Sequence, residues 1–243
     1  MAPTGQLTFY TAKYSPFAQR VHIALEEAKA EYTLWEFEVR GSKPEWYKQV
    51  NPLAKIPALT IGGPVVPPDQ PSTESTKLYE SIAILEFIAD VYPEANLRPA
   101  NPILRAKGRT FVEIYRNYVN EPFIDAFFRG KSVENVIQAL ERLQAALPPA
   151  GFAAGEWSIA DIAVAPFLTR MYLFMDRELG AYTREDWLKV RDSLDGEKFS
   201  RLKQYVQDIH GRPSFAKTWG SNNLQIELWK DHPGLRGKLV ASN

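Results

Sequence analysis

The stretch Phe9-Tyr-Thr-Ala-Lys-Tyr-Ser-Pro-Phe-Ala-Gln-Arg-Val21 decides how the first part of the chain folds. It joins a strand predicted over residues 7–10 to a helix that Ser15 and Pro16 open. Proline suits the first helical turn because its φ is already helical and its missing N–H has no intrahelical partner there. Ser15 is therefore expected at or next to the N-cap, beside unpaired N–H groups and the positive end of the helix dipole. The local sequence leaves two interpretations open: Ser15 is a helix cap only, or it also helps to hold an anion.

Strands and helices alternate around this stretch. Apolar residues at helical spacing extend the helix to Ala28, and the alternating, aromatic-rich run from Tyr32 to Val39 predicts a second strand. A strand, a helix and a strand in this order imply a right-handed parallel crossover. The next predicted elements are a helical turn, two strands separated by a long loop, and an apolar helix, at residues 43–50, 55–61, 77–79 and 82–91. The first 92 residues thus read β-α-β-α-β-β-α.

The rest of the chain predicts only helices. Residues 93–102 are rich in proline and poor in apolar side chains, which is typical of a linker between domains. A long helix with a bend near Pro122 is expected at residues 103–128, and Ser158 with Asp161 resembles a capping box that opens another helix. Further helices are expected at 132–147, 197–210 and 214–219. The predicted domains are therefore an α/β domain (1–92), a linker (93–102) and an all-α domain (103–243).

Composition excludes several classes of function. The 243 residues carry 29 basic and 29 acidic side chains without a long basic block, so nucleic acid and anionic membranes are not expected partners. There is no cysteine, which removes disulfides, thiolate metal sites and a protein thiol nucleophile. The three histidines are scattered, and no metal site is expected. The N-terminus lacks the features of a signal peptide, and no apolar run is long enough to span a membrane.

Four short features lie at the ends of elements in the first domain. They are Ser15-Pro16-Phe17, Lys43, Ile56-Pro57 and Glu80-Ser81. Each has an ordinary explanation when it is taken alone. A lysine is usually a solvated surface residue, a proline can simply begin a strand, and a serine with an acidic neighbour can simply cap a helix.

Taken together and in this order, these features resemble the glutathione-binding half of the cytosolic glutathione transferases. The motifs are Ser-Pro-Phe-Ala-Gln-Arg-Val (15–21), Lys-Pro-Glu-Trp (43–46), Asn-Pro-Leu-Ala-Lys-Ile-Pro (51–57) and Leu-Tyr-Glu-Ser (78–81). They are most similar to the omega class, and the serine-type tau class is a near second. The resemblance implies an α/β thioredoxin-like N-terminal domain followed by an all-α C-terminal domain. It also implies a cytoplasmic homodimer that uses glutathione as cosubstrate.

The resemblance assigns a role to each feature. It implies that Ser15 donates a hydrogen bond to the thiolate of glutathione, and that Ile56, before a cis Pro57, offers its backbone to the cysteinyl segment. Ser81 would bind the γ-glutamyl carboxylate, Glu80 would face the γ-glutamyl amine, and Lys43 would meet the glycyl carboxylate. Lowering a thiol pKa by ~2 units requires roughly 2.7 kcal/mol. One charge-assisted hydrogen bond together with a helix dipole is of that order.

The chain departs from the omega pattern at the position that matters most. Omega enzymes carry a cysteine where Ser15 stands, and they use it for thiol–disulfide exchange. Because this chain has no cysteine, it cannot form a mixed disulfide with glutathione. It therefore resembles the serine-bearing omega-like transferases of wood-decaying fungi, and reductase chemistry of the omega type is not expected.

Aromatic residues suggest a second, apolar site for flat aromatic molecules. The expected contacts, each also a common core residue, are Pro16, Phe17, Tyr118, Phe123, Phe127 and Tyr172. The first hypothesis is an enzyme that transfers glutathione to hydrophobic electrophiles and also reduces organic peroxides. The alternatives are a carrier of aromatic ligands such as wood-derived phenolics, a glutathione-dependent etherase, and a non-catalytic interaction module.

Overall fold

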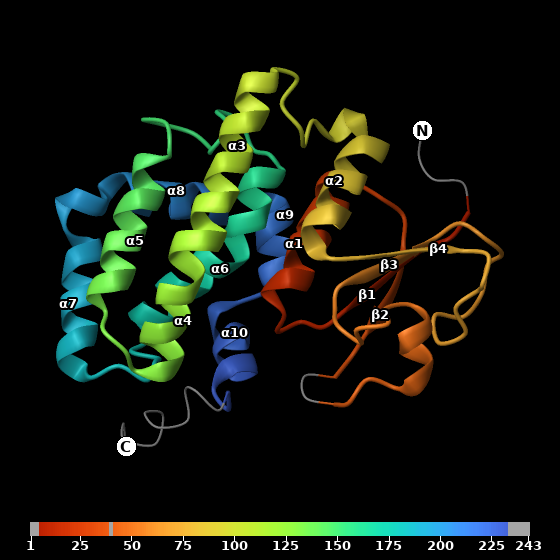
Figure 1. Cartoon of the computed structure of the whole chain (residues 1–243), viewed down its shortest axis with the longest axis horizontal. Helices are drawn as coiled ribbons and strands as arrows, with labels where there is room; N and C mark the ends of the chain where they lie inside the picture. Colours follow the sequence, from red (N-terminus) through yellow and green to blue (C-terminus); the bar gives the residue numbers. More distant parts are fainter. Residues whose placement is uncertain (1–4, 39–40, 233–243) are drawn as a thin grey trace. The chain divides into compact units, whose positions relative to one another are not determined.

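Two units make up the chain in the computed structural model, which describes residues 5–38 and 41–232 (Figure 1). The units are Met1–Arg98 and Pro99–Asn243, so the boundary falls among the residues expected to form a linker. The first unit contains a sheet with helices, and the described elements of the second are helices. This agrees with the predicted combination of an α/β domain and an all-α domain.

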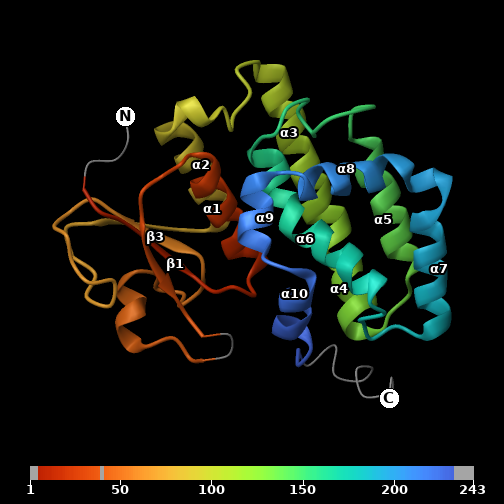
Figure 2. The ribbon, with the colours of Figure 1, turned by 180° about the vertical axis from the view of Figure 1, so that it is seen from behind.

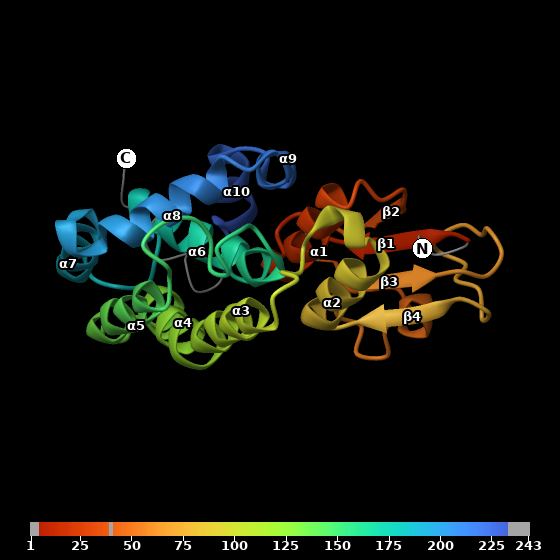
Figure 3. The ribbon, with the colours of Figure 1, turned by 90° about the horizontal axis from the view of Figure 1, so that it is seen from above.

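A mixed four-stranded sheet forms the centre of the N-terminal unit, with the strand order β2-β1-β3-β4 (Figure 3). Its strands are β1 (Leu7–Thr11), β2 (Thr33–Glu36), β3 (Ala58–Ile61) and β4 (Thr76–Tyr79). Strands β1 and β2 are parallel, as the predicted crossover requires, and helix α1 (Pro16–Glu27) connects them. Strand β3 is antiparallel to both β1 and β4. Helix α2 (Ser81–Val91) follows β4 and packs against α1.

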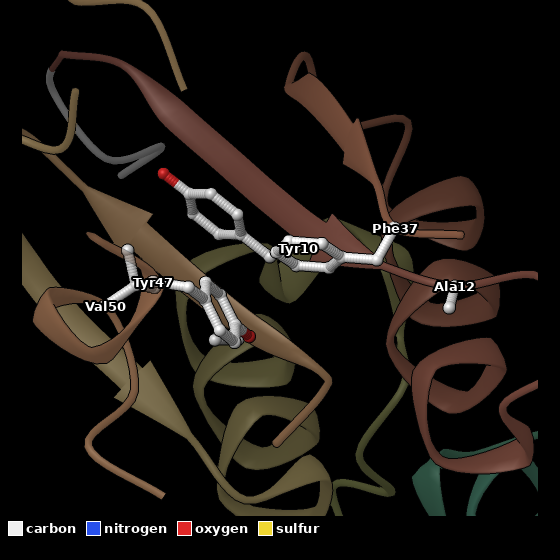
Figure 4. Close-up of a cluster of buried hydrophobic side chains, with 6 residues drawn as sticks. Tyr10, Ala12, Phe37, Tyr47 and Val50 are labelled. Carbon is white, nitrogen blue, oxygen red and sulfur yellow. The ribbon is translucent and has the colours of Figure 1, made fainter. Parts of the chain in front are cut away.

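The alternation of β1 supplies a core on each side of the sheet. Phe9 packs against His22 of α1 and Tyr32, with ring centroids 5.7 and 6.0 Å apart. The next residue, Tyr10, belongs to a buried cluster on the opposite face, which Figure 4 shows. The other members of this cluster are Ala12, Phe37, Tyr47, Val50 and Ala58.

A short 3-10 helix, η1 (Glu45–Gln49), contributes to this second core. Its Tyr47 is fully buried and lies edge-on to Phe37 at 4.7 Å between ring centroids. The cluster therefore fixes the segment between β2 and β3, which carries Lys43, Ile56 and Pro57.

Helix α6 (Ile159–Asp176) is the centre of the C-terminal unit and is buried on almost every side (Figure 2). It contacts α3 (Pro102–Ile114), α7 (Arg184–Asp195), α8 (Ser200–His210) and α10 (Asn222–Trp229). The other helices of this unit are α4 (Asn120–Arg129), α5 (Glu134–Ala145) and α9 (Pro213–Trp219). A helix that is apolar all round is expected at such a position.

The start of α6 is held by Ser158 and Asp161, which form a capping box. The fully buried Asp161 carboxylate accepts hydrogen bonds from the N–H of Ala153 (2.8 Å), the N–H of Ser158 (3.0 Å), the Ser158 hydroxyl (3.1 Å) and the Tyr205 hydroxyl (2.8 Å). Burial raises the pKa of Asp161 to about 6, although these four donors act in the opposite direction. The capping box thus also ties α6 to the preceding loop and to α8.

Several elements differ from the sequence-based expectation. The helix expected at 103–128 is interrupted by a π-helical turn, η3 (Tyr115–Val119), immediately before the segment that contains Pro122. Because Pro122 cannot donate a hydrogen bond to residue 118 and its ring crowds that carbonyl, the preceding turn widens. Helices α7 and α10 were not predicted, since each buries only a few side chains between polar residues.

Two expectations reach beyond the described residues. The predicted second strand extends to Val39, and the tail after Ser221 continues through residues 233–243. Val39 and residues 233–243 lie outside the described part. Within that part, no helix is long and apolar enough to cross a bilayer. Its His, Asp and Glu side chains form no group of three that could hold a metal ion.

Candidate functional site

A cavity of about 550 Å³ lies in the N-terminal unit, where the predicted glutathione-site residues meet. Phe17, Lys43, Ile56, Pro57, Glu80 and Ser81 all line it, although they come from four separate segments of the sequence. Its other lining residues are Tyr14, Gly41, Asn51, Ala54 and Lys55. Ser15 and Pro16 are not among them, but Tyr14 and Phe17 on either side of this pair are. A volume of this size is typical of small-ligand sites.

Ser15 is the N-cap of α1, as its sequence context predicts. Its hydroxyl accepts a hydrogen bond from the N–H of Ala18 at 3.2 Å, and the residue is 5% exposed. Among the described residues, none accepts a hydrogen bond from this hydroxyl. The Ser15 oxygen is thus occupied as an acceptor while its proton stays available, and a hydroxyl can do both at once. Capping and donation to an anion are therefore compatible roles.

Ser81 begins α2, and its hydroxyl accepts a hydrogen bond from Nη1 of Arg20 at 3.1 Å. Both side chains are buried. The described part of the chain again offers no acceptor for the Ser81 proton. The N–H groups of the first turn of α2 lie beside this hydroxyl and have no intrahelical partners. An anion at this point would meet a hydroxyl donor, backbone donors and the positive end of a helix dipole.

Glu80 precedes Ser81 and has a positive φ of 71°, with ψ of 109°. Such a conformation is costly for a residue other than glycine, of the order of 1–3 kcal/mol, and it is often found at functional sites. The Glu80 side chain is exposed and lines the cavity. The cavity lining therefore includes a carboxylate from the residue that precedes Ser81 and the start of α2.

Ile56 lines the cavity, and its backbone N–H and C=O are available for hydrogen bonds. Neither its N–H nor its C=O has a backbone hydrogen-bond partner among the described residues, and the Ile56–Pro57 peptide is cis. The preceding carbonyl is held firmly: the Lys55 oxygen accepts from the Tyr47 hydroxyl and from Nδ2 of Asn51, both at 2.8 Å. The core cluster thus supports the backbone segment that is expected to pair with an extended peptide.

Two lysines are among the residues that line the cavity. Lys43 lies with Nζ 4.7 Å from the ring centroid of Phe37, and partial burial lowers the pKa of Lys43. Lys55 is exposed and also lines the cavity. The ammonium group of a lining lysine is suited to a carboxylate of a bound ligand.

Sequence reasoning missed three residues of this site. Lys55 lies within the 51–57 motif but has no sequence signal that separates it from a surface lysine, and Tyr14 lies just before the motif that begins at Ser15. Arg20 lies one turn inside α1, and only its burial shows that it does not point into solvent. The burial of Arg20 and its contact with Ser81 at the start of α2 can be recognised only in the folded structure.

The residues expected at the second, apolar site belong to both units, and each is described within its own unit. Phe17 is 48% exposed and lines the N-terminal cavity, and Arg20 lies over its ring at 5.3 Å. Phe123 and Phe127 are buried in the C-terminal unit and pack on each other at 4.6 Å between centroids. Tyr118 is 52% exposed on the π-helical turn. Tyr172 lines a different cavity, which belongs entirely to the C-terminal unit.

Comparison with known proteins shows the family to which the chain belongs. Residues 14–91 match the family described as glutathione S-transferase, N-terminal domain, and residues 124–208 match the corresponding C-terminal domain. The crystal structure of glutathione transferase Omega 2S from Trametes versicolor is 58% identical, covers 96% of this chain and 100% of its own, and has a TM-score of 0.92. The chain belongs to the glutathione transferase family. It is omega-like, and its fold is the glutathione transferase fold.

A ligand complex of the same Trametes transferase and one further relative are also similar to this chain. The same Trametes transferase in complex with 2,4-dihydroxybenzophenone is 57% identical to this omega-like glutathione transferase, with a TM-score of 0.91. That structure covers 96% of this chain and 100% of its own. Pyrimidodiazepine synthase from Drosophila melanogaster is 29% identical over 230 residues, which are 92% of this chain and 85% of the synthase.

Proposed function

We propose that this glutathione transferase activates glutathione as a thiolate beside Ser15 and transfers it to hydrophobic, aromatic electrophiles. The observation that carries the proposal is the Ser15 hydroxyl, whose oxygen is fixed by the Ala18 N–H and whose proton is left to donate. The nucleophile is the sulfur of glutathione rather than a protein atom. Its proton goes to solvent, the sulfur bonds to the electrophilic carbon, and the leaving group departs with the bonding electrons.

The rest of the cavity fits the remainder of glutathione. Its γ-glutamyl carboxylate suits Ser81 and the free N–H groups of α2, and the Glu80 carboxylate suits the γ-glutamyl amine. The glycyl carboxylate suits Lys43, with Lys55 as a second cation. The unpaired backbone of Ile56 would pair with the cysteinyl segment. The half-exposed Phe17 ring then borders the electrophile.

Ligand carriage is the second candidate function, and one comparison favours it. A transferase 57% identical to this chain is known in complex with 2,4-dihydroxybenzophenone, an aromatic ligand. A chain that binds such molecules tightly and transfers glutathione slowly would be a carrier. The two functions are compatible in one protein.

Turnover of 1-chloro-2,4-dinitrobenzene at saturating glutathione distinguishes the two. The proposal expects measurable conjugation that Ser15→Ala largely abolishes while glutathione still binds. Thr183→Ala is the matched control, because Thr183 caps α7 in the same way, accepting from the Asp186 N–H at 3.1 Å. It should lose the same cap stabilisation, about 1 kcal/mol, without losing rate. If Ser15→Ala keeps the rate within about twofold of the parent, Ser15 acts only as a helix cap.

A further inference from the structure

Tyr14 lines the cavity of the N-terminal unit and immediately precedes Ser15. The N–H of Ser15 donates to the carbonyl of Ala12 at 3.0 Å, which closes a turn between β1 and α1 and fixes the backbone of Tyr14. The Tyr14 side chain is partly buried and packs against the core cluster shown in Figure 4. A ring that is held by a turn and by a core cluster loses little conformational freedom when a ligand binds beside it.

The Tyr14 hydroxyl differs from the neighbouring tyrosine hydroxyls. Tyr10 and Tyr47 of the core cluster each donate to a backbone carbonyl at 2.8 Å. Within the part of the chain that the structure describes, the Tyr14 hydroxyl has no hydrogen-bond partner, and it is not among the enclosed polar atoms. Because Tyr14 lines the cavity, a molecule bound there can accept this proton.

The proposed binding mode of glutathione leaves this donor without a role. Ser15, Ser81 and Lys43 are each assigned to a group of glutathione. Asn51, another uncharged side chain of the described lining, is engaged at both ends with backbone groups, at 2.8 and 3.0 Å. Tyr14 is therefore an uncharged donor of the lining that remains for the second substrate.

Such a donor matters for electrophiles in which negative charge develops on an oxygen. When a thiolate adds to the β-carbon of an α,β-unsaturated carbonyl compound, the sulfur–carbon bond forms while the electrons of the double bond move toward the carbonyl oxygen. No group leaves, so this oxygen carries the negative charge until the α-carbon takes a proton from solvent. A preorganised donor at the oxygen stabilises the transition state. Since the oxygen is conjugated to the attacked carbon but lies away from it, the thiolate and the oxygen can be held by neighbouring residues.

We infer that Tyr14 is a catalytic residue, whose hydroxyl donates a hydrogen bond to the carbonyl oxygen of an α,β-unsaturated ketone or aldehyde while glutathione adds to it. Ser15 would stabilise the sulfur before the attack, and Tyr14 would stabilise the oxygen that receives the charge. Phe17, which is half-exposed and also lines the cavity, would cover the apolar part of the molecule. The inference rests on the proposed glutathione transfer and names a preferred class of electrophile for it.

Two aryl electrophiles test the inference by their kinetics. 4-Phenyl-3-buten-2-one carries the conjugated carbonyl, whereas benzyl chloride has no oxygen and releases chloride. Tyr14→Phe should lower kcat/KM for the ketone about ten- to a hundredfold and should leave the value for benzyl chloride within about twofold, because only the first reaction places charge on an oxygen. The Kd for glutathione should not change. Tyr32→Phe is the matched control: it removes a hydroxyl that donates to Glu26 on the opposite face of the sheet, and it should lower neither rate.

Infrared spectroscopy of the bound ketone adduct, isotope-labelled at its carbonyl carbon, separates donation from packing. The carbonyl stretch should lie at a lower wavenumber in the parent protein than in Tyr14→Phe, because a hydrogen bond weakens the C=O bond. Equal wavenumbers, an unchanged ketone rate in Tyr14→Phe, or an equal loss of rate with both electrophiles would overturn the inference and leave the proposed transfer intact. If the parent conjugates neither electrophile, the transfer function is itself wrong, and the inference fails with it.

Discussion

Arg20 and Ser81 stand 61 positions apart in the sequence, and their buried side chains form a hydrogen bond of 3.1 Å between Nη1 and Oγ. The arginine can only donate, so the serine oxygen must accept and the serine proton is turned away from it. Arg20 thereby orients the hydroxyl at the start of α2 and places a positive charge behind it. This contact connects α1 and α2, whose starts are expected to bind the anionic groups of glutathione.

The first prediction is that Arg20 acts through Ser81. Arg20→Lys and Ser81→Ala should each weaken glutathione binding about tenfold, because each removes a charge-assisted or oriented hydrogen bond. The double variant should lose clearly less than the product of the two factors. Calorimetric titration of the four proteins, with thermal unfolding to check the fold, measures this coupling. If the loss of affinity in the double variant equals the product of the two single losses, Arg20 does not position Ser81.

The second prediction concerns charge at the opposite end of the ligand. Lys43→Gln should raise the Kd for glutathione about fivefold and make binding less sensitive to salt, since one cation–carboxylate attraction is lost. Lys48→Gln is the matched control, because Lys48 is an exposed lysine of the same segment that pairs with Glu45 at 2.9 Å. An equal effect of both substitutions on the affinity would mean that only the overall charge matters.

The third prediction tests the chemistry of the Ser15 position. Ser15→Cys places a thiol at a helix N-terminus, where the dipole lowers a thiol pKa. The variant should reduce a glutathione mixed disulfide, which the cysteine-free parent cannot do by way of a protein thiol. Assay with a small mixed disulfide of glutathione measures the gain. If the Ser15→Cys variant binds glutathione but stays inert, residue 15 does not reach the sulfur.

The fourth prediction concerns stability. Asp161→Asn should cost about 2–4 kcal/mol of unfolding free energy, because it replaces one accepting oxygen of the carboxyl group by an NH2 donor and leaves buried donors without an acceptor. The pKa of Asp161 is raised to about 6, so its stabilising contribution is largest below the ordinary value of 3.8 and is lost as the pH rises through 6. The cost of the substitution should therefore be larger at pH ~4.5 than at pH ~7.5. Urea unfolding at both pH values measures it, and a cost that grows with pH would contradict the sign.

The sequence predicted the N-terminal unit better than the C-terminal one, for a physical reason. Alternating strands and the Ser15-Pro16 helix start are local signals, and so is the capping box of Ser158 and Asp161. The elements they predict are all present in the structure. Helices α7 and α10 bury so few side chains that their patterns do not stand out from polar loops.

The candidate site shows the same limit. Lys43, Ile56 and Ser81 could be named because each belongs to a short motif, and the structure places all three around one cavity. Arg20 could not be named, since its contact with Ser81 depends on how two helices pack. The sequence also could not show which aromatic residues of the C-terminal unit belong to the core and which line a cavity. Phe127 is fully buried in the core, whereas Tyr172 lines a cavity of that unit.

The pKa of the glutathione thiol in the bound complex tests the central claim most directly. It is measured by the ultraviolet absorbance of the thiolate as the pH is varied, in the parent protein, in Ser15→Ala and in the Thr183→Ala control. Ser15 together with the dipole of α1 should lower this pKa by ~2 units from the free value near ~8.5, and Thr183→Ala should keep the lowered value. In Ser15→Ala the pKa should return to within about half a unit of free glutathione. An equally low thiol pKa in Ser15→Ala would contradict the account, because the hydroxyl of Ser15 would then have no part in forming the nucleophile.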